Sequence, residues 1–104
     1  MSDNLISLNK KITSCRNCKR LVEFREKVAN DKRKQYLTEN YWGKPVPGFG
    51  EKDAQILILG LAPAAHGANR TGRVFTGDKS SEFLFKCLYK SKISNKSNSI
   101  NQDD

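Results

Sequence analysis

The chain has 104 residues, enough for one small domain, and its 37% hydrophobic content beside 29% charged residues is lean for a core that folds unaided. Lysine and arginine number 19 against 11 acidic residues, and the resulting net charge of +8 fits either a polyanionic partner such as nucleic acid or a basic, solvated surface. No apolar run approaches the roughly 20 residues of a membrane span, and the N-terminus lacks the apolar core of a signal peptide. We expect a cytoplasmic protein without a membrane partner.

The spacing of apolar residues predicts two helices in the first third of the chain. Residues 4–11 place Leu5 and Leu8 on one face, and residues 19–34 repeat apolar side chains at helical spacing between charged ones. The apolar stripe of the second helix, which we expect to contact the core, consists of Leu21, Phe24 and Val28.

A Cys-x-x-Cys pair, Cys15 and Cys18, lies between these two helices. Two thiolates three positions apart can bind one metal ion or cluster, which is the interpretation we favour. A redox pair usually follows a strand, which is not predicted here, and incidental thiols are the third interpretation. The third cysteine, Cys87, makes the number odd, which argues against a disulfide framework, and we expect it to be a buried small hydrophobe on a helix.

The rest of the chain is predicted to contain one strand and one more helix. Residues 43–50 are too rich in glycine and proline for a helix or a central strand. We expect the aromatic side chains that lead into this loop, Tyr36, Tyr41 and Trp42, to pack it onto the domain rather than stack on bases. The apolar run at residues 56–59 predicts a buried strand, and residues 80–90 predict a helix with Ser80 as its N-cap. The polar tail after Tyr89 is expected to be disordered unless further sequence covers it.

The loop at residues 60–78 follows the predicted strand without a break and is the part richest in chemistry. A buried strand that ends in a loop of glycine, alanine and small polar residues is a common ligand site in α/β proteins. Gly60 permits close backbone approach, and Pro63 fixes the turn. The amides of Leu61 and Ala62 are potential donors to a carbonyl or a phosphate. Neither the Walker pattern nor the Rossmann glycine spacing is present.

Three side chains of the same loop, Asn69, Phe75 and Asp78, suit a pocket for a planar base, and the role of a fourth, His66, stays open. Asn69 offers a donor and an acceptor, and Phe75 offers a face for stacking. Asp78 is a carboxylate at the start of the next helix. His66, the sole histidine, is either an acid, base or hydrogen-bonding group of the site or a structural residue.

Residues 60–78 read Gly-Leu-Ala-Pro-Ala-Ala-His-Gly-Ala-Asn-Arg-Thr-Gly-Arg-Val-Phe-Thr-Gly-Asp. This stretch closely resembles the first motif of the family 5 (type 5) uracil-DNA glycosylases. The similarity extends upstream through residues 47–50 and the cysteine pair, and it covers most of residues 12–90. The related family 4 enzymes typically carry Gly-Glu-Ala-Pro-Gly at this loop, so Leu61 and Ala64 favour family 5.

The resemblance implies an α/β fold, a three-layer αβα arrangement around a parallel sheet, of which this chain would be the N-terminal part. It also implies a monofunctional DNA glycosylase of base-excision repair. Such an enzyme flips a deaminated base out of the duplex and hydrolyses its N-glycosidic bond. The implied partner is DNA that contains uracil or another deaminated base, and the implied state is a monomer.

The resemblance also implies roles for the loop residues. The backbone around Leu61 and Ala62 would hold the base, and Phe75 would stack on it. Asp78 would orient water or stabilise the positively charged sugar, and its alternative interpretation is a helix N-cap. The histidine and the asparagine of the loop would shape the pocket or contact the adjacent DNA backbone.

The resemblance is incomplete in two respects. The family's 4Fe-4S cluster uses four cysteines, and only Cys15 and Cys18 match two of them, because Cys87 lies too early in the chain. The family's second motif, which contains a histidine, is absent. We therefore expect residues 1–90 to be the N-terminal portion of a single glycosylase domain and residues 91–104 to be a disordered tail at a truncation. The chain alone is expected to fold poorly and to have little or no activity.

Two other hypotheses stay open. In the first, the chain is a small basic module that binds nucleic acid without enzymatic activity, with a zinc ion shared between two chains. In the second, the chain is one half of a split glycosylase that reassembles with a complementing C-terminal half.

Overall fold

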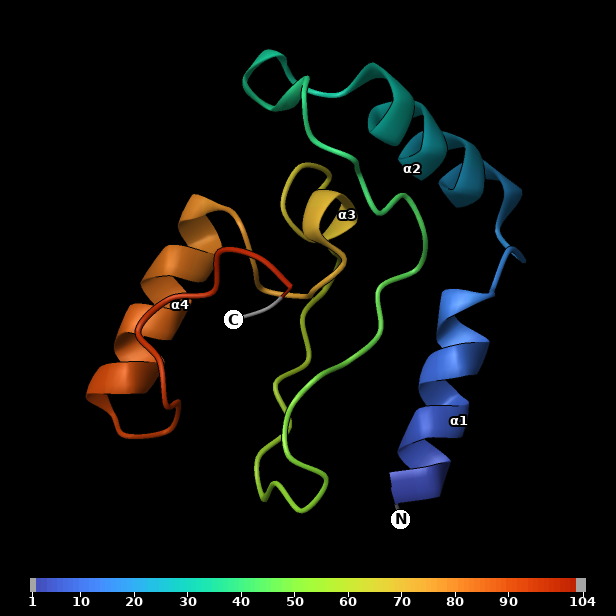
Figure 1. Ribbon diagram of the computed structural model, residues 1–104. Helices are drawn as coiled ribbons and strands as arrows, with labels where there is room; N and C mark the ends of the chain where they lie inside the picture. Colours follow the sequence, from blue (N-terminus) through green and yellow to red (C-terminus); the bar gives the residue numbers. More distant parts are fainter. Residues whose placement is uncertain (1, 103–104) are drawn as a thin grey trace.

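The computed structural model describes residues 2–102 (Figure 1). Within this range the chain forms α1 (Ser2–Thr13), α2 (Lys19–Asp31), the short 3-10 helix η1 (Lys34–Tyr36), α3 (Ala68–Thr71) and α4 (Lys79–Lys90). No described residue belongs to a β-strand. None of the described helices has both the length and the apolar character that a bilayer crossing requires.

A long stretch of irregular chain connects η1 to α3. α1 and α4 stand on opposite sides of the extended residues 43–60, α2 lies above α1, and α3 lies near the centre (Figure 1). Among the described helices only α2 and α3 pack closely against each other. The radius of gyration is 14.3 Å, compared with about 13 Å for a compact chain of 100 residues. The molecule is therefore more open than a domain built around one core.

The first two helices form where the apolar spacing predicts them, but α2 does not bury the predicted stripe. It ends at Asp31 rather than at residue 34, because Lys32 takes a left-handed conformation with a φ of 61°. Leu21 and Phe24 are 54% and 57% exposed, whereas Val22 is buried. The predicted core contact is therefore wrong for these two residues of the stripe, whereas the third, Val28, is half-buried. Burial depends on what packs against a helix, and among the described helices only the four-residue α3 packs against α2.

α4 confirms the predicted last helix and corrects two of its details. Its N-cap is Asp78, whose carboxylate accepts a hydrogen bond from the Ser81 N–H, and not Ser80. Cys87 is exposed, so the expected burial of this thiol is wrong. The buried apolar side chain of the helix is Phe85, because α4 turns only a narrow face inward.

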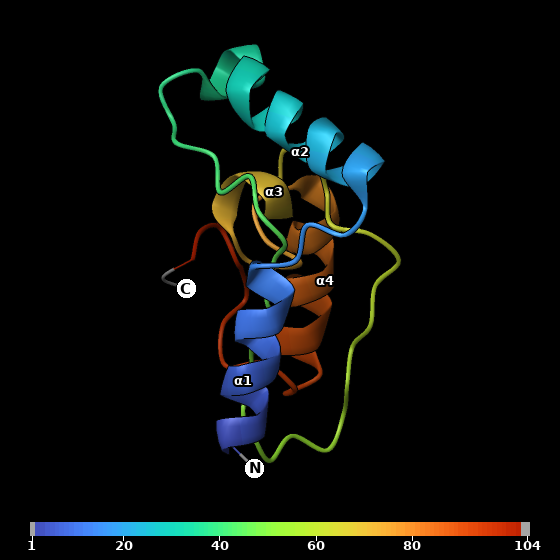
Figure 2. The ribbon, with the colours of Figure 1, turned by 90° about the vertical axis from the view of Figure 1, so that its right-hand side faces the viewer.

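The predicted strand at residues 56–59 is unpaired in the described structure, and the implied parallel sheet is not formed within residues 2–102. Leu57 and Leu59 are 85% and 87% exposed, and the two isoleucines of the opposite face are 63% and 42% exposed. Figure 2 shows this part of the chain looping away from the helices. The expected burial is wrong, because a strand that is apolar on both faces needs neighbouring strands and covering helices, and the described residues supply neither.

The glycine- and proline-rich loop packs onto the domain, as predicted. The N–H of Trp42 donates to the carbonyl of Arg70 at 3.1 Å. The N–H of Gly43 donates to the carbonyl of Asn69 at 3.0 Å. A Cβ at Gly72 would lie 2.8 Å from the Trp42 ring, so the indole rests directly on this glycine. These contacts tie the loop to α3.

Buried side chains are few, and most of them are polar. The buried apolar residues are Val22, Ala68 and Phe85, and the buried polar residues are Asn69, Thr76, Ser81 and Ser99. The hydroxyl oxygens of Thr76 and Ser99 lie 2.6 Å apart, and the Ser99 carbonyl accepts the Gly77 N–H at 3.0 Å. The polar tail that we expected to be disordered thus folds back onto the loop in its described part.

Candidate functional site

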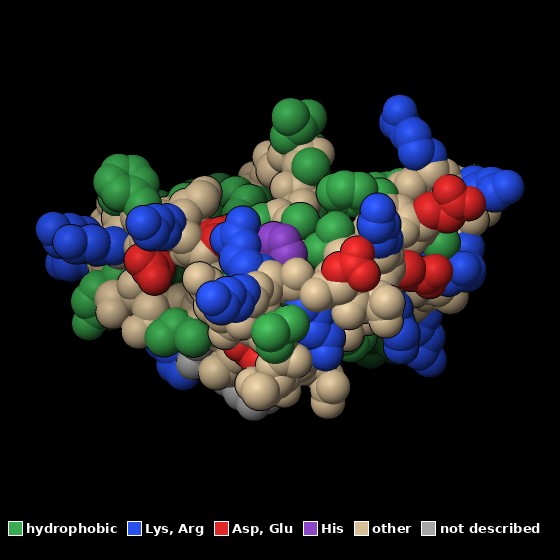
Figure 3. All heavy atoms as spheres, turned by 90° about the horizontal axis from the view of Figure 1, so that it is seen from above, with side chains coloured by type: hydrophobic (Ala, Val, Ile, Leu, Met, Phe, Trp, Pro, Cys, Tyr) green, Lys and Arg blue, Asp and Glu red, His purple; other side chains and the backbone are tan. Residues whose placement is uncertain are grey.

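A small cavity brings together two of the predicted site residues, His66 and Asp78. It has a volume of about 230 Å³. The other residues that line it are Arg33, Tyr36, Ala64, Ala65, Gly67 and Gly77. Figure 3 shows the single histidine at the surface, with lysine and arginine side chains beside it. An imidazole, a carboxylate, a phenol and a guanidinium therefore converge on one hollow.

Tyr41 holds the ring of His66. The tyrosine hydroxyl lies 2.7 Å from Nδ1, and the two rings meet edge to face with 5.8 Å between their centroids. Burial lowers the pKa of His66 below its ordinary value, and the positive charges of Arg33 and Arg70 lower it further. The imidazole is therefore neutral at neutral pH. Since Nδ1 is engaged by Tyr41, Nε2 is the ring nitrogen that is left for a ligand.

The lowered pKa of His66 makes the stability of the chain depend on pH. The unfolded chain binds the proton at a higher pH than the folded chain. The contribution to stability is therefore fully present above the ordinary pKa of 6.5 and is lost as the pH falls through the folded value. We expect the free energy of unfolding to decrease from about pH 7 to about pH 5, and to decrease less in His66→Gln. Urea unfolding of both chains across this range measures the difference, and parallel curves would contradict the expectation.

Asp78 caps α4 and faces the cavity with the same carboxylate. Oδ1 accepts the Ser81 N–H at 2.8 Å, and the Asp78 N–H donates to the Ser81 hydroxyl at 3.1 Å, which forms a reciprocal capping box. Oδ2 lies 2.6 Å from the position that a Cβ at Gly67 would take. The cap thus fixes the carboxylate through one oxygen and leaves the other over Gly67.

Replacing Gly67 with alanine is expected to displace the Asp78 carboxylate. The added methyl would lie 2.6 Å from Oδ2 and 3.0 Å from the Thr76 carbonyl oxygen, which is backbone and cannot swing aside. Overpacking of this kind destabilises a protein by about 1–3 kcal/mol. Thermal unfolding measures the loss, and Gly48→Ala is the control, because nothing lies within 4 Å of a Cβ there. Equal stability of the two variants would contradict the expectation.

The part of the loop expected to hold the base lies at the surface. The exposed residues are Gly60, Leu61, Ala62 and Pro63, with Leu61 fully exposed at 103%. The ring of Phe75 lies against Gly60, 3.0 Å from the position that a Cβ would take there. Phe75 itself has a φ of 51°, which is uncommon for an aromatic residue. The structure brings Phe75 and Gly60 together, and neither lines the small cavity.

Asn69 is buried, and its side chain connects two helices. Its Nδ2 donates to the Arg25 carbonyl of α2 at 3.1 Å. Its backbone N–H donates to the Ala64 carbonyl at 3.0 Å. The amide is not among the groups that line the cavity, and its contact with a substrate stays a prediction.

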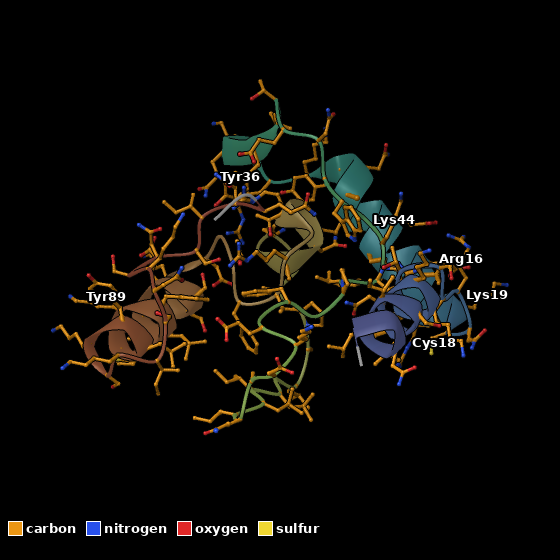
Figure 4. All side chains as sticks on the ribbon, turned by 60° about the horizontal axis from the view of Figure 1, so that its bottom comes forward. Arg16, Cys18, Lys19, Tyr36, Lys44 and Tyr89 are labelled. Atoms are coloured by element: carbon orange, nitrogen blue, oxygen red, sulfur yellow. The ribbon has the colours of Figure 1, made fainter. Side chains whose placement is uncertain are left out.

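Cys15 and Cys18 flank the turn between α1 and α2, and both thiols are exposed. Figure 4 shows Cys18 beside Arg16 and Lys19 at the junction of these helices. No group of three or more histidine, cysteine or acidic residues that could hold a metal ion forms within residues 2–102. A tetrahedral metal or a four-thiolate cluster needs four ligands, so the pair does not fit such a group on its own.

The family model of the uracil DNA glycosylase superfamily matches residues 47–102, which include the loop and the two predicted site residues that line the cavity, His66 and Asp78. The chain belongs to this superfamily. The match confirms the resemblance of the loop to uracil-DNA glycosylases, and it assigns the chain to a superfamily whose domain is an α/β fold.

Curated relatives of this superfamily carry one common name. The chain is 50% identical over 101 residues to the type-5 uracil-DNA glycosylase of Mycobacterium tuberculosis, 53% identical over 93 residues to that of Thermus thermophilus, and 48% identical over 94 residues to that of Pyrobaculum aerophilum. These alignments cover 97%, 89% and 90% of this chain, but only 38%, 42% and 41% of the relatives. The chain thus spans about two fifths of the length of the curated relatives that it matches.

Four charged or aromatic side chains of the site were not predicted as site residues from the sequence. They are Arg33, Tyr36, Tyr41 and Arg70, of which the first two line the cavity and the other two hold the histidine. Tyr41 lies 25 positions before its partner in the chain, so no local spacing could mark the pair. The aromatic residues before the glycine- and proline-rich loop were the only signal, and it indicated packing rather than a site.

Proposed function

We propose that this chain forms the base-binding part of a type-5 uracil-DNA glycosylase, an enzyme that hydrolyses the N-glycosidic bond of uracil and other deaminated bases in DNA. The observation that carries the proposal is that the Asp78 carboxylate and the neutral His66 imidazole line the same small cavity. The name shared by relatives at 48% to 53% identity supports it. The net charge of +8 suits a DNA partner.

In this proposal Asp78 activates the water that attacks the sugar. In the transition state the sugar becomes positively charged and the base becomes negatively charged. Oδ1 accepts the capping hydrogen bond, so Oδ2 is the oxygen that can act as a base. It takes a proton from water while the water oxygen bonds to C1′ of the sugar. The electron pair of the breaking C1′–N bond leaves with the base, which then accepts the proton. The carboxylate charge also stabilises the developing sugar cation.

In this proposal His66 stabilises the departing base. When Tyr41 donates to Nδ1, the ring proton lies on Nε2, which can donate to a carbonyl oxygen of uracil as negative charge grows there. The lowered pKa keeps the imidazole neutral, so His66 acts as a hydrogen-bond donor rather than as a cation. Phe75 supplies a ring face for stacking, and the amides of Leu61 and Ala62 supply further donors. The side chain of Asn69 ties this loop to α2 through its hydrogen bond to the Arg25 carbonyl.

The chain needs further structure before it can act. Alternate apolar residues at the end of the extended segment are exposed, namely Leu57, Leu59 and Leu61. Such exposure is expected of the central strand of a three-layer αβα fold before neighbouring strands pair with it. We propose that the remaining strands come from further residues of the same polypeptide or from a separate C-terminal half. The isolated chain is accordingly expected to show little or no excision.

Cys15 and Cys18 are proposed as two of the four thiolates of a 4Fe-4S cluster in the completed protein, with the other two from outside this chain. Both thiols are exposed and free to meet such ligands. The completed protein would then be brown, with visible absorbance. Loss of this absorbance in the double variant Cys15→Ser/Cys18→Ser would support the cluster. A colourless protein that contains zinc would overturn it in favour of a metal-bearing nucleic-acid module.

A chimera tests the proposed activity. The 93 aligned residues of the Thermus thermophilus relative are replaced by those of this chain. The chimera is incubated with oligonucleotides that contain one uracil, and abasic sites are read as strand breaks after alkali. Excision by the chimera, with little or none by the isolated chain, is the expected result. A folded chimera that binds the oligonucleotide but leaves the uracil in place would overturn the glycosylase and favour a binding module without activity.

A further inference from the structure

Arg70 stands at the centre of the loop that carries the site, and its side chain is only 10% exposed. Its Nε donates to the His66 carbonyl at 2.6 Å, and its Nη2 donates to the Gly77 carbonyl at 2.9 Å. Nη1 pairs with Glu39 at 2.7 Å. The ring of Tyr36 covers the flat face of the guanidinium, with 3.9 Å from Cζ to the ring centroid. Every donor nitrogen of this one side chain is therefore engaged.

These contacts join two separate places in the loop at residues 60–78. His66 lies just before α3, and Gly77 is the residue immediately before Asp78. One guanidinium thus binds the backbone at each of the two places from which the cavity's imidazole and carboxylate project. The pair with Glu39 and the stack on Tyr36 fix the plane of the guanidinium from the opposite chain segment.

We propose that Arg70 is the positioning residue of this site, a clamp that sets the distance between His66 and Asp78 by holding the backbone beside each of them. The reaction that the clamp serves rests on the proposed function. The clamp itself is a property of this chain's own fold, so the two can be tested separately.

The geometry requires an arginine rather than any cation. A guanidinium presents its donors in a rigid planar fork and stacks on aromatic rings, whereas a lysine ammonium is one compact point charge. A Cβ at Gly77 would lie 2.6 Å from Nη2, so the guanidinium rests against bare backbone there. Arg70→Lys therefore keeps the positive charge and loses the clamp, which separates the two roles that Arg70 could have.

The single histidine gives the test a direct spectroscopic readout. NMR follows the His66 imidazole against pH in the 104-residue chain, in Arg70→Lys and in Arg70→Gln. Tyr41 contacts this ring, and Arg33 and Arg70 lower its pKa. Tyr36 and Asp78 line the same cavity and stay unchanged in both variants. A clamp predicts that both variants open the loop, release the ring from Tyr41 and raise the pKa of His66 toward its ordinary value. A rise in Arg70→Gln with an unchanged pKa in Arg70→Lys would mean that charge alone matters, and would overturn the proposal.

Glu39→Ala shifts the pKa of His66 in opposite directions under the two explanations, a charge effect and a clamp. This variant tests the proposal even if the Arg70 variants fail to fold. Glu39 is 45% exposed and does not line the cavity. Removing its negative charge lowers the pKa of His66 if only the field matters, whereas a loosened clamp raises it because the ring becomes better solvated. A lower or unchanged pKa in Glu39→Ala would overturn the proposal.

Activity of the chimera supplies the second readout. Misplacing reacting groups by about 1 Å costs on the order of 10²-fold in rate, so Arg70→Lys is expected to lower kcat by that order. KM should change little, because each donor nitrogen of Arg70 is already bound to the chain itself. A parental kcat in Arg70→Lys would overturn the proposal. An inactive parent chimera would overturn the proposed function instead, and the NMR test of the clamp would still decide.

Arg20→Gln is the matched control. Arg20 is an exposed residue of α2, so the variant removes the same charge from the surface without touching the loop. Both the His66 titration and kcat are expected to stay at the parental values. A shift in Arg20→Gln as large as that in Arg70→Gln would show a general charge effect and would overturn the clamp.

Discussion

Replacing Asp78 with asparagine is expected to remove most of the excision activity of the chimera and to leave its thermal stability nearly unchanged. Asparagine caps helices about as well as aspartate, and its side-chain oxygen can accept the Ser81 N–H as the carboxylate does. The amide carries no negative charge and cannot take a proton from water. Loss of a general base lowers kcat roughly 10²–10⁴-fold. Single-turnover excision and the Tm of the same preparation measure the two effects.

Two further variants separate the cap from the chemistry. Asp78→Ala loses both the capping oxygen and the charge, so it should lose activity and also about 1 kcal/mol of stability. Ser81→Ala loses the hydroxyl that accepts from the Asp78 N–H but keeps the backbone N–H that holds the carboxylate. It should lose stability and keep activity. Full activity in Asp78→Asn would mean that Asp78 is a helix cap and not a catalytic group.

The double variant Leu57→Ser/Leu59→Ser is expected to change stability little in the isolated chain and to destabilise the chimera strongly. In the isolated chain these side chains are 85% and 87% exposed. Exposed substitutions usually change stability by no more than about 0.5 kcal/mol, and the loss of apolar surface should reduce self-association. In the completed protein each leucine is expected to be buried and to contribute about 1.5–3 kcal/mol, so the pair costs about 3–6 kcal/mol.

Urea unfolding and sedimentation of both proteins measure this contrast. A loss of about 3–6 kcal/mol approaches the whole stability of a small domain, so the chimera variant should be largely unfolded. Ile93→Ser is the control, because Ile93 is 56% exposed but follows α4 in the chain and is not part of the predicted strand. It should change little in either protein. A double leucine variant that behaves alike in both proteins would mean that residues 56–59 never become a central strand.

The elements that the sequence predicts well are those whose formation is local. α1, α2 and α4 follow from apolar side chains at helical spacing, and each appears within a few residues of its expected bounds. Even here the sequence offers two candidates for the cap of α4, because Ser80 and Asp78 are both good capping residues by type. The reciprocal bond with Ser81 decides between them, and composition alone does not reveal it.

Burial and the site depend on chain segments that local spacing does not contain. The exposed Leu21 and Phe24 have the right period for a buried face, yet nothing among the described helices other than α3 packs on α2. The motif at residues 60–78 predicted where the chemistry lies. It did not predict that Tyr41 and Arg70 would hold His66 from two sides, because those contacts exist only after the chain has turned back on itself.

The return of the polar tail to the loop sets a practical limit on how the chain can be shortened. By composition, residues 91–102 look dispensable, and a domain boundary after α4 would remove them. That cut would leave the Thr76 hydroxyl without its contact to Ser99 and the Gly77 N–H without its acceptor, both directly before Asp78. Protease-resistant fragments of this protein are therefore expected to retain the segment through Ser99, although it carries almost no apolar residues.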